Sequence, residues 1–319
     1  MSSSGLQRLT VIGAGVLGGQ IAWQSAFKGK TVTVYDPFEE SLERCRAAQD
    51  QYALIYQQDL GASSEDIDAT RERLTLTTDL AAAAGNTDLV IEAAPEIPEV
   101  KSQLYRDLAD HLPERAIVAT NSSTLLPSQF ADDSGRPDRF CCLHFANLIW
   151  SMNLAEVMAH PGTSRETILA ITQFAIEIGM VPVPLQKEHN AYVINSLLVP
   201  LLQASQTLVT NGISTPETVD RTYMIMNRGC ARGPFGVIDI VGMETCYNIL
   251  NHWGTENSDE QMLANAEYIK THFIDKGHMG LQTGQGYYSY PDPAYQADDF
   301  LDVPDISQAQ SFADLVGTG

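Results

Sequence analysis

The sequence predicts an α/β fold, with a doubly wound parallel sheet followed by an all-α C-terminal domain. Through residues 1–186, short apolar runs bounded by turn or polar residues alternate with helical segments, which is typical of buried parallel strands and their crossover helices. From residue 191 to residue 290 we find no convincing strand, and helical periods dominate. We therefore expect a sheet domain at 1–186, a helical domain at 187–290 and an acidic peripheral tail at 291–319.

The charge balance is strongly acidic, with 40 Asp and Glu residues against 19 Lys and Arg residues and a formal net charge of −21. This balance argues against nucleic acids and anionic membranes as partners, because both attract basic patches. The N-terminus has no apolar signal core, no uncharged run reaches membrane-spanning length, and the five cysteines lack metal-ligand spacing. We expect a cytoplasmic protein with reduced thiols and no metal site.

The first elements follow a strand–helix–strand order. Residues 9–12 and 31–35 are predicted as strands, and residues 16–27 as the helix between them. Residues 38–73 are predicted as a long helical hairpin that is interrupted near Gly61.

Three more short apolar runs, at residues 89–92, 117–119 and 141–145, are predicted as buried parallel strands. Ligands of such sheets bind outside the carboxyl ends of the strands. Functional side chains are therefore expected in the loops that follow the predicted strands.

The glycine-rich turn in residues 10–22, TVIGAGVLGGQIA, predicts a dinucleotide site. Gly13 permits a tight turn, Gly15 lets the backbone approach a pyrophosphate, and Gly18 lets the helix pack closely on the strand. The helix N-terminus offers unpaired N–H groups to phosphates. Asp36, directly after the second strand, can accept hydrogen bonds from a ribose and would repel a 2′-phosphate, which favours NAD.

The helical domain is expected to contain four helices, at residues 192–209, 216–226, 235–250 and 259–274. The second of them has Thr215 as an N-cap and Pro216 at its start. The first is apolar nearly all round, so we expect it to be buried between domains or at a subunit contact, and we expect a homodimer.

Polar residues follow two of the predicted strands. Residues 120–124 read TNSST, His144 and Asn147 follow the next apolar run, and Glu156 lies 12 residues beyond the histidine. Imidazole titrates near neutrality, so His144 can take the proton of an alcohol. A chain reversal would bring Glu156 to the other ring nitrogen, where a carboxylate fixes the tautomer. Ser123 and Asn147 can then hold the substrate oxygen and carbonyl.

Each of these residues also has a structural explanation. A single histidine among seven is more often structural than catalytic, residues 121–124 can form a turn or helix cap, and Glu156 can be an ordinary exposed side chain. Composition and spacing therefore indicate a dehydrogenase without naming it.

Taken together, six segments resemble the 3-hydroxyacyl-CoA dehydrogenase family over roughly residues 8–290. They are the glycine turn with Asp36, IEAAPEIPEVK at 91–101, NSSTL at 121–125, HFAN at 144–147 with AEV at 155–157, RGPFGVIDIVG at 232–242, and TGQGYY at 283–288. The resemblance implies a Rossmann-type NAD-binding domain, an all-helical C-terminal domain that dimerises, and NAD-linked oxidation of an L-3-hydroxyl group, a reaction of fatty acid metabolism.

The resemblance also implies roles for individual residues. His144 corresponds to the family's general base and Glu156 to its carboxylate partner, while Ser123, Asn147 and Asn195 match residues that contact the substrate or the nicotinamide. The expected cofactor contacts are Gly13, Gly15, Val16, Leu17, Gly18, Asp36, Glu96, Lys101, Asn121, Ser123 and Asn147.

The sequence departs from the family pattern in several places. Residues 148–150 read LIW where relatives usually have proline, residues 190–192 read NAY in place of the usual PGF, and Gln282 replaces a basic residue. Residues 39–73, where relatives carry lysines for the CoA phosphates, hold nine acidic residues against four arginines. CoA brings about four negative charges, so this surface opposes its binding. These features most resemble a branch that includes diketoreductases acting without CoA.

Three functions follow as hypotheses. The first is an NAD-dependent 3-hydroxyacyl-CoA dehydrogenase that transfers hydride between NAD(H) and C3 of its substrate. The second is a CoA-independent reductase of β-keto acids, esters or diketones. The third is a non-catalytic cofactor-binding protein with a structural or regulatory role.

Overall fold

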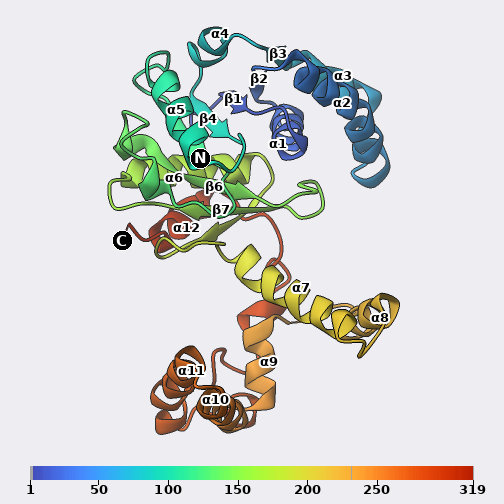
Figure 1. Cartoon of the computed structure of the whole chain (residues 1–319), viewed down its shortest axis with the longest axis vertical. Helices are drawn as coiled ribbons and strands as arrows, with labels where there is room; N and C mark the ends of the chain where they lie inside the picture. Colours follow the sequence, from blue (N-terminus) through green and yellow to red (C-terminus); the bar gives the residue numbers. More distant parts are fainter. Residues whose placement is uncertain (1–2, 231, 319) are drawn as a thin grey trace. The chain divides into compact units, whose positions relative to one another are not determined.

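The computed structural model describes residues 3–230 and 232–318 (Figure 1). The chain forms two compact units. The first extends to residue 204 and includes the chain from residue 303 onward, and the second comprises residues 205–302.

The first unit contains an eight-stranded sheet in the order β3-β2-β1-β4-β5-β6-β7-β8. All neighbouring strands are parallel except β6 and β7, which are antiparallel. The strands are β1 (Arg8–Ile12), β2 (Thr31–Tyr35), β3 (Leu74–Thr77), β4 (Leu89–Glu92), β5 (Ile117–Thr120), β6 (Phe140–Phe145), β7 (Leu154–Met158) and β8 (Val181–Pro184). The predicted doubly wound sheet is confirmed.

Three strands, β3, β7 and β8, are not among the predicted apolar runs, and two of them, β3 and β8, are the edges of the sheet. Strand β3 reads LTLT and has no fully buried residue, while β8 reads VPVP. The threonines of β3 interrupt its apolar sequence. The prolines of β8 cannot donate hydrogen bonds to a strand ladder, and within sheets proline is found mainly on edge strands. Neither segment therefore has the continuous apolar sequence of a central strand.

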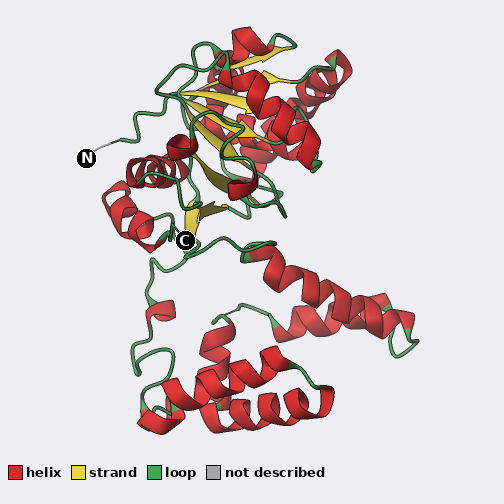
Figure 2. Ribbon diagram, turned by 60° about the vertical axis from the view of Figure 1, so that its left-hand side comes forward, coloured by secondary structure: helices red, strands yellow, loops and turns green. Residues whose placement is uncertain are grey.

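Helices cover both faces of this sheet (Figure 2). They are α1 (Val16–Phe27), α2 (Glu39–Asp59), α3 (Ser64–Glu72), α4 (Leu80–Ala84), α5 (Pro98–Ala109), α6 (Arg165–Glu177) and α12 (Ala309–Leu315). Short 3₁₀ turns span Pro127–Gln129, Pro137–Arg139 and Ile306–Gln308.

Successive residues of a central strand join different cores, because side chains of a strand alternate between the two faces. On β4, Leu89 and Ile91 pack in the core that contains α1, α2, α6 and α12 residues. Val90, between them, packs with Tyr105 and Leu108 of α5 on the opposite face. Both faces of the strand are therefore buried, which explains its unbroken apolar sequence.

The helical hairpin of residues 38–73 is confirmed. Helix α2 ends at Asp59, Gly61 adopts a φ of 68°, and α3 begins after Ser63. Ser63 and Asp66 form a reciprocal capping box, which satisfies free backbone N–H groups at the start of α3.

The end of the expected tail at 291–319 returns to the first unit. Helix α12 packs on α6 and β8, with Ala309 and Ala313 buried. The Arg165 guanidinium donates hydrogen bonds to the carbonyl oxygens of Val316 (2.7 Å) and Ala313 (3.0 Å). Residues from 303 onward therefore contribute to the core around the sheet.

The second unit is helical, as predicted. Its helices are α8 (Pro216–Met226), α9 (Pro234–Val241), α10 (Met243–Asn257) and α11 (Glu260–His272), with 3₁₀ turns at Ile274–Lys276, Leu281–Thr283 and Ala294–Gln296. Helix α7 (Ile194–Thr210) begins in the first unit and ends in the second. Several apolar side chains of α7, including Leu197 and Val199, are exposed in the single chain.

The prediction of one continuous helix at 235–250 is wrong. Gly242 adopts a φ of 92°, which residues with a Cβ rarely adopt, and it separates α9 from α10. Among the residues that the structure describes, no helix is both long enough and apolar enough to cross a bilayer.

Candidate active site

Four polar side chains on neighbouring strands, including the predicted His144 and Glu156, lie on one face of the sheet because of strand register. Glu92 on β4 is paired with Thr120 on β5, and His144 on β6 is paired with Glu156 on β7. Directly opposite residues on neighbouring strands point to the same face. Glu92 and Glu156 are fully buried, and His144 is 4% exposed.

The structure brings His144 and Glu156 into direct contact. The chain reverses between β6 and β7, and the imidazole Nδ1 lies 2.7 Å from Glu156 Oε2. The backbone N–H groups of Val193 and Ile194 donate to the other carboxylate oxygen at 2.7 and 2.9 Å. An ionised carboxylate only accepts hydrogen bonds, so the proton of neutral His144 resides on Nδ1 and leaves Nε2 as an acceptor.

The Nε2 atom of His144 faces the loop that follows β5. Its distance to Ser123 Oγ is 3.2 Å. Asn121, two residues before Ser123, is buried, and its side-chain oxygen accepts a 2.9 Å hydrogen bond from the Phe145 N–H. This bond links the end of β5 to the end of β6 and holds the loop beside the histidine.

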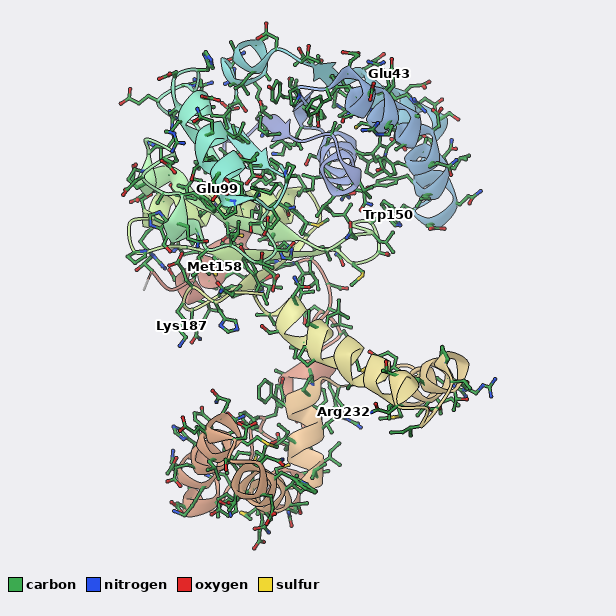
Figure 3. All side chains as sticks on the ribbon, viewed as in Figure 1. Glu43, Glu99, Trp150, Met158, Lys187 and Arg232 are labelled. Atoms are coloured by element: carbon green, nitrogen blue, oxygen red, sulfur yellow. The ribbon has the colours of Figure 1, made fainter. Side chains whose placement is uncertain are left out.

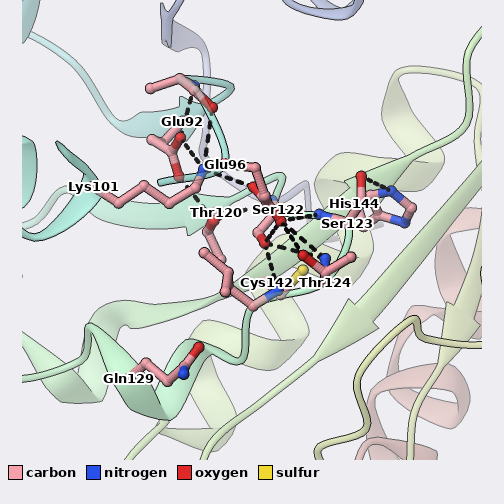
Figure 4. A network of polar contacts seen from close by, with 12 residues as sticks. Glu92, Glu96, Lys101, Thr120, Ser122, Ser123, Thr124, Gln129, Cys142 and His144 are labelled. Atoms are coloured by element: carbon pink, nitrogen blue, oxygen red, sulfur yellow. Dashed lines mark hydrogen bonds and ion pairs between the residues drawn. The ribbon is translucent and has the colours of Figure 1, made fainter. Parts of the chain in front are cut away.

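A second network holds the same loop from the side of α5 (Figure 4). Glu96 accepts hydrogen bonds from the N–H groups of Ser123 and Thr124, both at 3.0 Å, and from the Ser122 hydroxyl. Burial alone would raise the pKa of Glu96, but these hydrogen bonds and the nearby Lys101 ammonium lower it to about 2. Glu96 therefore binds the loop as a carboxylate.

Lys101 lies beneath this loop. Its ammonium is 1% exposed and contacts Glu92 Oε1 at 2.6 Å and Glu96 Oε2 at 3.3 Å. The sequence predicted Glu96 and Lys101 as cofactor contacts. In the structure their charged groups bind each other and the loop, so direct contact with the cofactor stays a prediction.

The glycine turn has the geometry that a pyrophosphate requires. Gly13 has a φ of 103°, and a Cβ there would lie 2.5 Å from the Ala93 carbonyl oxygen. A Cβ on Gly18 would overlap the carbonyl oxygen of Gly13, whereas a Cβ on Gly15 would meet no atom within 4 Å. The space beside Gly15 is therefore open to a ligand.

The start of α1 also fits an anionic ligand. Its N-cap, Gly15, provides no side-chain hydrogen bond, and the first turn, which includes Val16 and Leu17, holds no acidic residue. Its N–H groups and helix dipole are thus directed at the open space. At the end of β2, Asp36 accepts hydrogen bonds from the N–H groups of Ala14 (2.9 Å) and Phe38 (3.1 Å). These residues fit a dinucleotide.

The remaining two predicted residues lie in nearby segments. Asn147 is exposed in the loop after β6, and Asn195 is half-buried in the first turn of α7. The structure describes no contact between either amide and the His144–Glu156 pair, so their roles stay predictions.

Two residues next to the site were not predicted from the sequence. The Gln20 side chain on α1 accepts a 2.8 Å hydrogen bond from the N–H of Leu148, which has a φ of 59°. Tyr192 stacks on the His144 ring, with centroids 5.0 Å apart. There was little indication of Gln20 in the sequence, because α1 also contains the polar residues Gln24 and Ser25. The signal for Tyr192 was its departure from the family's phenylalanine.

The loop after β6 is also fixed by an aromatic contact. Trp150 packs against Tyr52 and Tyr56 of α2, with ring centroids 5.8 and 6.3 Å apart (Figure 3).

A glycine turn that is open to an anionic ligand and a buried His–Glu pair on two strands of the same doubly wound sheet are the features of a dinucleotide-dependent dehydrogenase. Residues 8–189 match the NAD-binding domain of 3-hydroxyacyl-CoA dehydrogenase, and residues 192–290 match its C-terminal domain. The chain belongs to the 3-hydroxyacyl-CoA dehydrogenase family. It is an oxidoreductase whose cofactor is NAD.

Its relatives include proteins with different substrates in their names. The chain is 32% identical to the mitochondrial hydroxyacyl-coenzyme A dehydrogenase of Homo sapiens, over 89% of this chain and 91% of that protein. It is 30% identical to a probable 3-hydroxybutyryl-CoA dehydrogenase of Deinococcus radiodurans, over 88% and 99%. A solved diketoreductase, described for dual catalysis of dicarbonyl compounds, is 43% identical with a TM-score of 0.66, over 91% and 100%.

Proposed function

We propose that this protein interconverts 3-hydroxy and 3-oxo groups, with His144 as the acid/base and Glu156 as its partner. The observation that carries the proposal is the geometry of the imidazole. Its Nδ1 contacts the Glu156 carboxylate at 2.7 Å, while its Nε2 faces Ser123 at 3.2 Å. A histidine oriented in this way can exchange a proton with a substrate oxygen on its Nε2 side.

NAD supplies the acceptor or donor of hydride when it is bound. In the oxidation direction, Nε2 of His144 takes the proton of the substrate hydroxyl, and Glu156 stabilises the imidazolium that forms. The Ser123 hydroxyl donates a hydrogen bond to the same substrate oxygen. In the reduction direction, protonated His144 returns the proton to the oxygen.

The test of this role compares two buried histidines. We expect His144→Ala to lower kcat by about 10²- to 10⁴-fold with any 3-oxo substrate and to leave NADH binding unchanged. His160→Ala is the matched control. His160 is also buried, but its Nε2 lies 2.9 Å from the Pro137 carbonyl oxygen and not beside Ser123, so its removal should not lower kcat in the same way. Equal kcat values for the His144→Ala protein and the unmodified protein would refute the assignment.

The direction of turnover gives a second readout, because oxidation releases a proton and reduction consumes one. Initial rates with NADH absorbance should favour oxidation at higher pH and reduction at lower pH. A flat profile in both directions would contradict histidine as the acid/base.

For the substrate, we propose a CoA-free β-keto acid, ester or diketone. All nine acidic side chains of residues 39–73 are exposed, among them Glu43 on the outer side of α2 (Figure 3). Arg71 and Arg73 are half-buried, and Arg71 forms an ion pair with Asp50. The surface where relatives hold CoA phosphates is thus more acidic than the composition alone implies. The 43% identity to a diketoreductase supports the same choice.

Acetoacetyl-CoA and ethyl acetoacetate separate the two substrate classes. We expect the ester to have the higher kcat/KM, and Glu43→Lys to raise kcat/KM for the thioester alone. Glu166→Lys changes the same charge on an exposed residue of α6 and should leave both values unchanged. A much higher kcat/KM for the thioester in the unmodified protein would favour the CoA-dependent activity instead.

The alternative to an enzyme is a non-catalytic protein that binds the cofactor and has a structural or regulatory role. NADH binding without oxidation of any 3-hydroxy compound in a panel would support it. We further propose a cytoplasmic homodimer, which cell fractionation and light scattering would test.

A further inference from the structure

The chain between β8 and α7 adopts an unusual backbone next to the His144–Glu156 pair. Ala191 and Tyr192 have φ values of 66° and 56°. Left-handed conformations are unfavourable for residues that carry a Cβ, and they persist only where the surrounding contacts require them.

This left-handed turn allows one short segment to contact both members of the pair. The N–H groups of Val193 and Ile194 bind the Glu156 carboxylate. The Tyr192 ring lies on the His144 imidazole, with an interplanar angle of 27° and a centroid distance of 5.0 Å.

The Tyr192 ring is itself fixed in place. It is 1% exposed and packs in a small core with Cys142, Met158 and Leu185. Its hydroxyl donates a 3.0 Å hydrogen bond to the Leu125 carbonyl oxygen and accepts one from the Cys142 thiol at 3.2 Å. Burial, with the neighbouring thiol, holds the pKa of Tyr192 well above its usual range, so the hydroxyl stays a donor.

We propose that Tyr192 is a positioning residue that fixes the ring plane of His144, an inference that rests on the proposed acid/base role of that histidine. The Glu156 contact restrains only Nδ1, and an imidazole held at one nitrogen can still tilt about that bond. An aromatic ring against its face removes this tilt and keeps Nε2 directed at Ser123 and the substrate oxygen. The stacked ring also attracts the imidazolium that forms during oxidation.

Three variants test the contribution of the ring. Tyr192→Phe keeps the stack and loses the hydroxyl, whereas Tyr192→Leu and Tyr192→Met fill the space without a ring. We expect Leu and Met to lower kcat by about 10- to 100-fold, since small misplacements of a catalytic group cost up to about 10²-fold. The KM for NADH should not change, and Phe should retain kcat within about threefold.

Phe174 provides the matched control. It is fully buried on α6, and the Lys30 ammonium lies 5.5 Å from the centre of its ring. Phe174→Leu removes a buried aromatic ring from the core of the same unit, so it should lower the melting temperature while kcat per folded molecule stays unchanged.

A spectroscopic readout remains informative where a variant is unstable. The Nδ1 proton of His144, shared with Glu156, should give a resolved downfield proton NMR signal in the unmodified protein. We expect Tyr192→Phe to retain this signal and Tyr192→Met to broaden it.

Normal kcat and an unchanged signal in folded Tyr192→Met would overturn the proposal and leave Tyr192 as a core residue. Equal losses of kcat in Tyr192→Phe and Tyr192→Met would also overturn it, because the hydroxyl and not the stacked ring would then matter. If His144→Ala remains active, the proposed function itself fails, which is a separate result.

Discussion

Two carboxylates are fully buried on the same face of the sheet, Glu92 on β4 and Glu156 on β7, and they differ in the partner that each binds. Glu92 contacts the Lys101 ammonium at 2.6 Å and accepts hydrogen bonds from Thr120 and Tyr105. Glu156 contacts the His144 imidazole at 2.7 Å and accepts two backbone N–H groups.

The difference separates a buried ion pair with a lysine from the pair that we propose as the acid/base. A buried carboxylate requires compensation for lost hydration, and a lysine ammonium next to it provides that as a permanent positive charge. A histidine provides the charge only when it is protonated, and imidazole gains and loses a proton near neutral pH. Lys101 therefore links Glu92 to Glu96, which binds the loop at 122–124, whereas the proposed acid/base role requires the His144–Glu156 pair to change its charge during turnover.

Glu156→Gln should produce the largest effect. The amide keeps the shape of the side chain, but it removes the charge that stabilises the imidazolium, so we expect kcat to fall by about 10²- to 10⁴-fold. Steady-state rates and NADH fluorescence titration would measure this. If kcat fell no further than in Glu92→Gln, the two carboxylates would not differ as described.

Lys101→Met should produce the largest loss of stability. It leaves Glu92 buried without a cation, so the free energy of unfolding in urea should fall by about 3–5 kcal/mol. Adding Glu92→Gln should recover much of this loss. Arg106, on the same helix, forms a more exposed ion pair with Asp133, and Arg106→Met should cost less than about 1 kcal/mol. If Lys101→Met and Arg106→Met lowered the free energy of unfolding equally, the structural role of Lys101 would be contradicted.

A third carboxylate, Asp36, is half-buried at the end of β2 and is predicted to bind the ribose of the cofactor. Replacing it should relieve repulsion of a 2′-phosphate and remove charged hydrogen bonds worth about 1.5–3 kcal/mol. We expect Asp36→Ala to shift the ratio of kcat/KM for NADPH over NADH upward by about 10- to 100-fold. Asp36→Asn, which keeps an acceptor for the Ala14 N–H, should control for damage to the turn. An unchanged ratio in both variants would exclude this role.

Glu96→Gln should have the smallest effect, and one that depends on pH. Because the pKa of Glu96 falls from 4.5 to about 2 on folding, its ionised form stabilises the folded protein above pH 4.5. This contribution disappears as the pH falls from 4.5 toward 2. Urea midpoints should therefore be lower for Glu96→Gln at pH 7 and converge with those of the unmodified protein near pH 2. A difference in urea midpoint that stayed constant from pH 7 to pH 2 would show that the charge of Glu96 does not cause the loss of stability.

Local patterns were sufficient to predict much of the fold. The central strands appear as continuous apolar runs because both of their faces are buried, and the glycine turn between β1 and α1 appears because few other residues adopt its backbone. The edge strands β3 and β8 were missed because half-exposed strands with threonine or proline lack that signal. The break at Gly242 was missed because a single glycine does not disturb helical periodicity, whereas its φ of 92° does end the helix.

The site, like the fold, has features that the sequence predicted and features that only the structure shows. The sequence by itself supplied the candidate groups, namely an imidazole, a carboxylate and a hydroxyl on or next to neighbouring strands and an acid after the second strand. The sequence also predicted that Glu156 meets His144, but only the tertiary structure decided the geometry of that contact and the other partners of the site. The antiparallel register of β6 and β7 pairs His144 with Glu156, and burial turns Lys101 away from solvent onto Glu92. The left-handed turn at Ala191 and Tyr192 places a ring on the imidazole. These contacts join side chains on different elements, so they depend on register and packing and leave no periodic signal in the sequence.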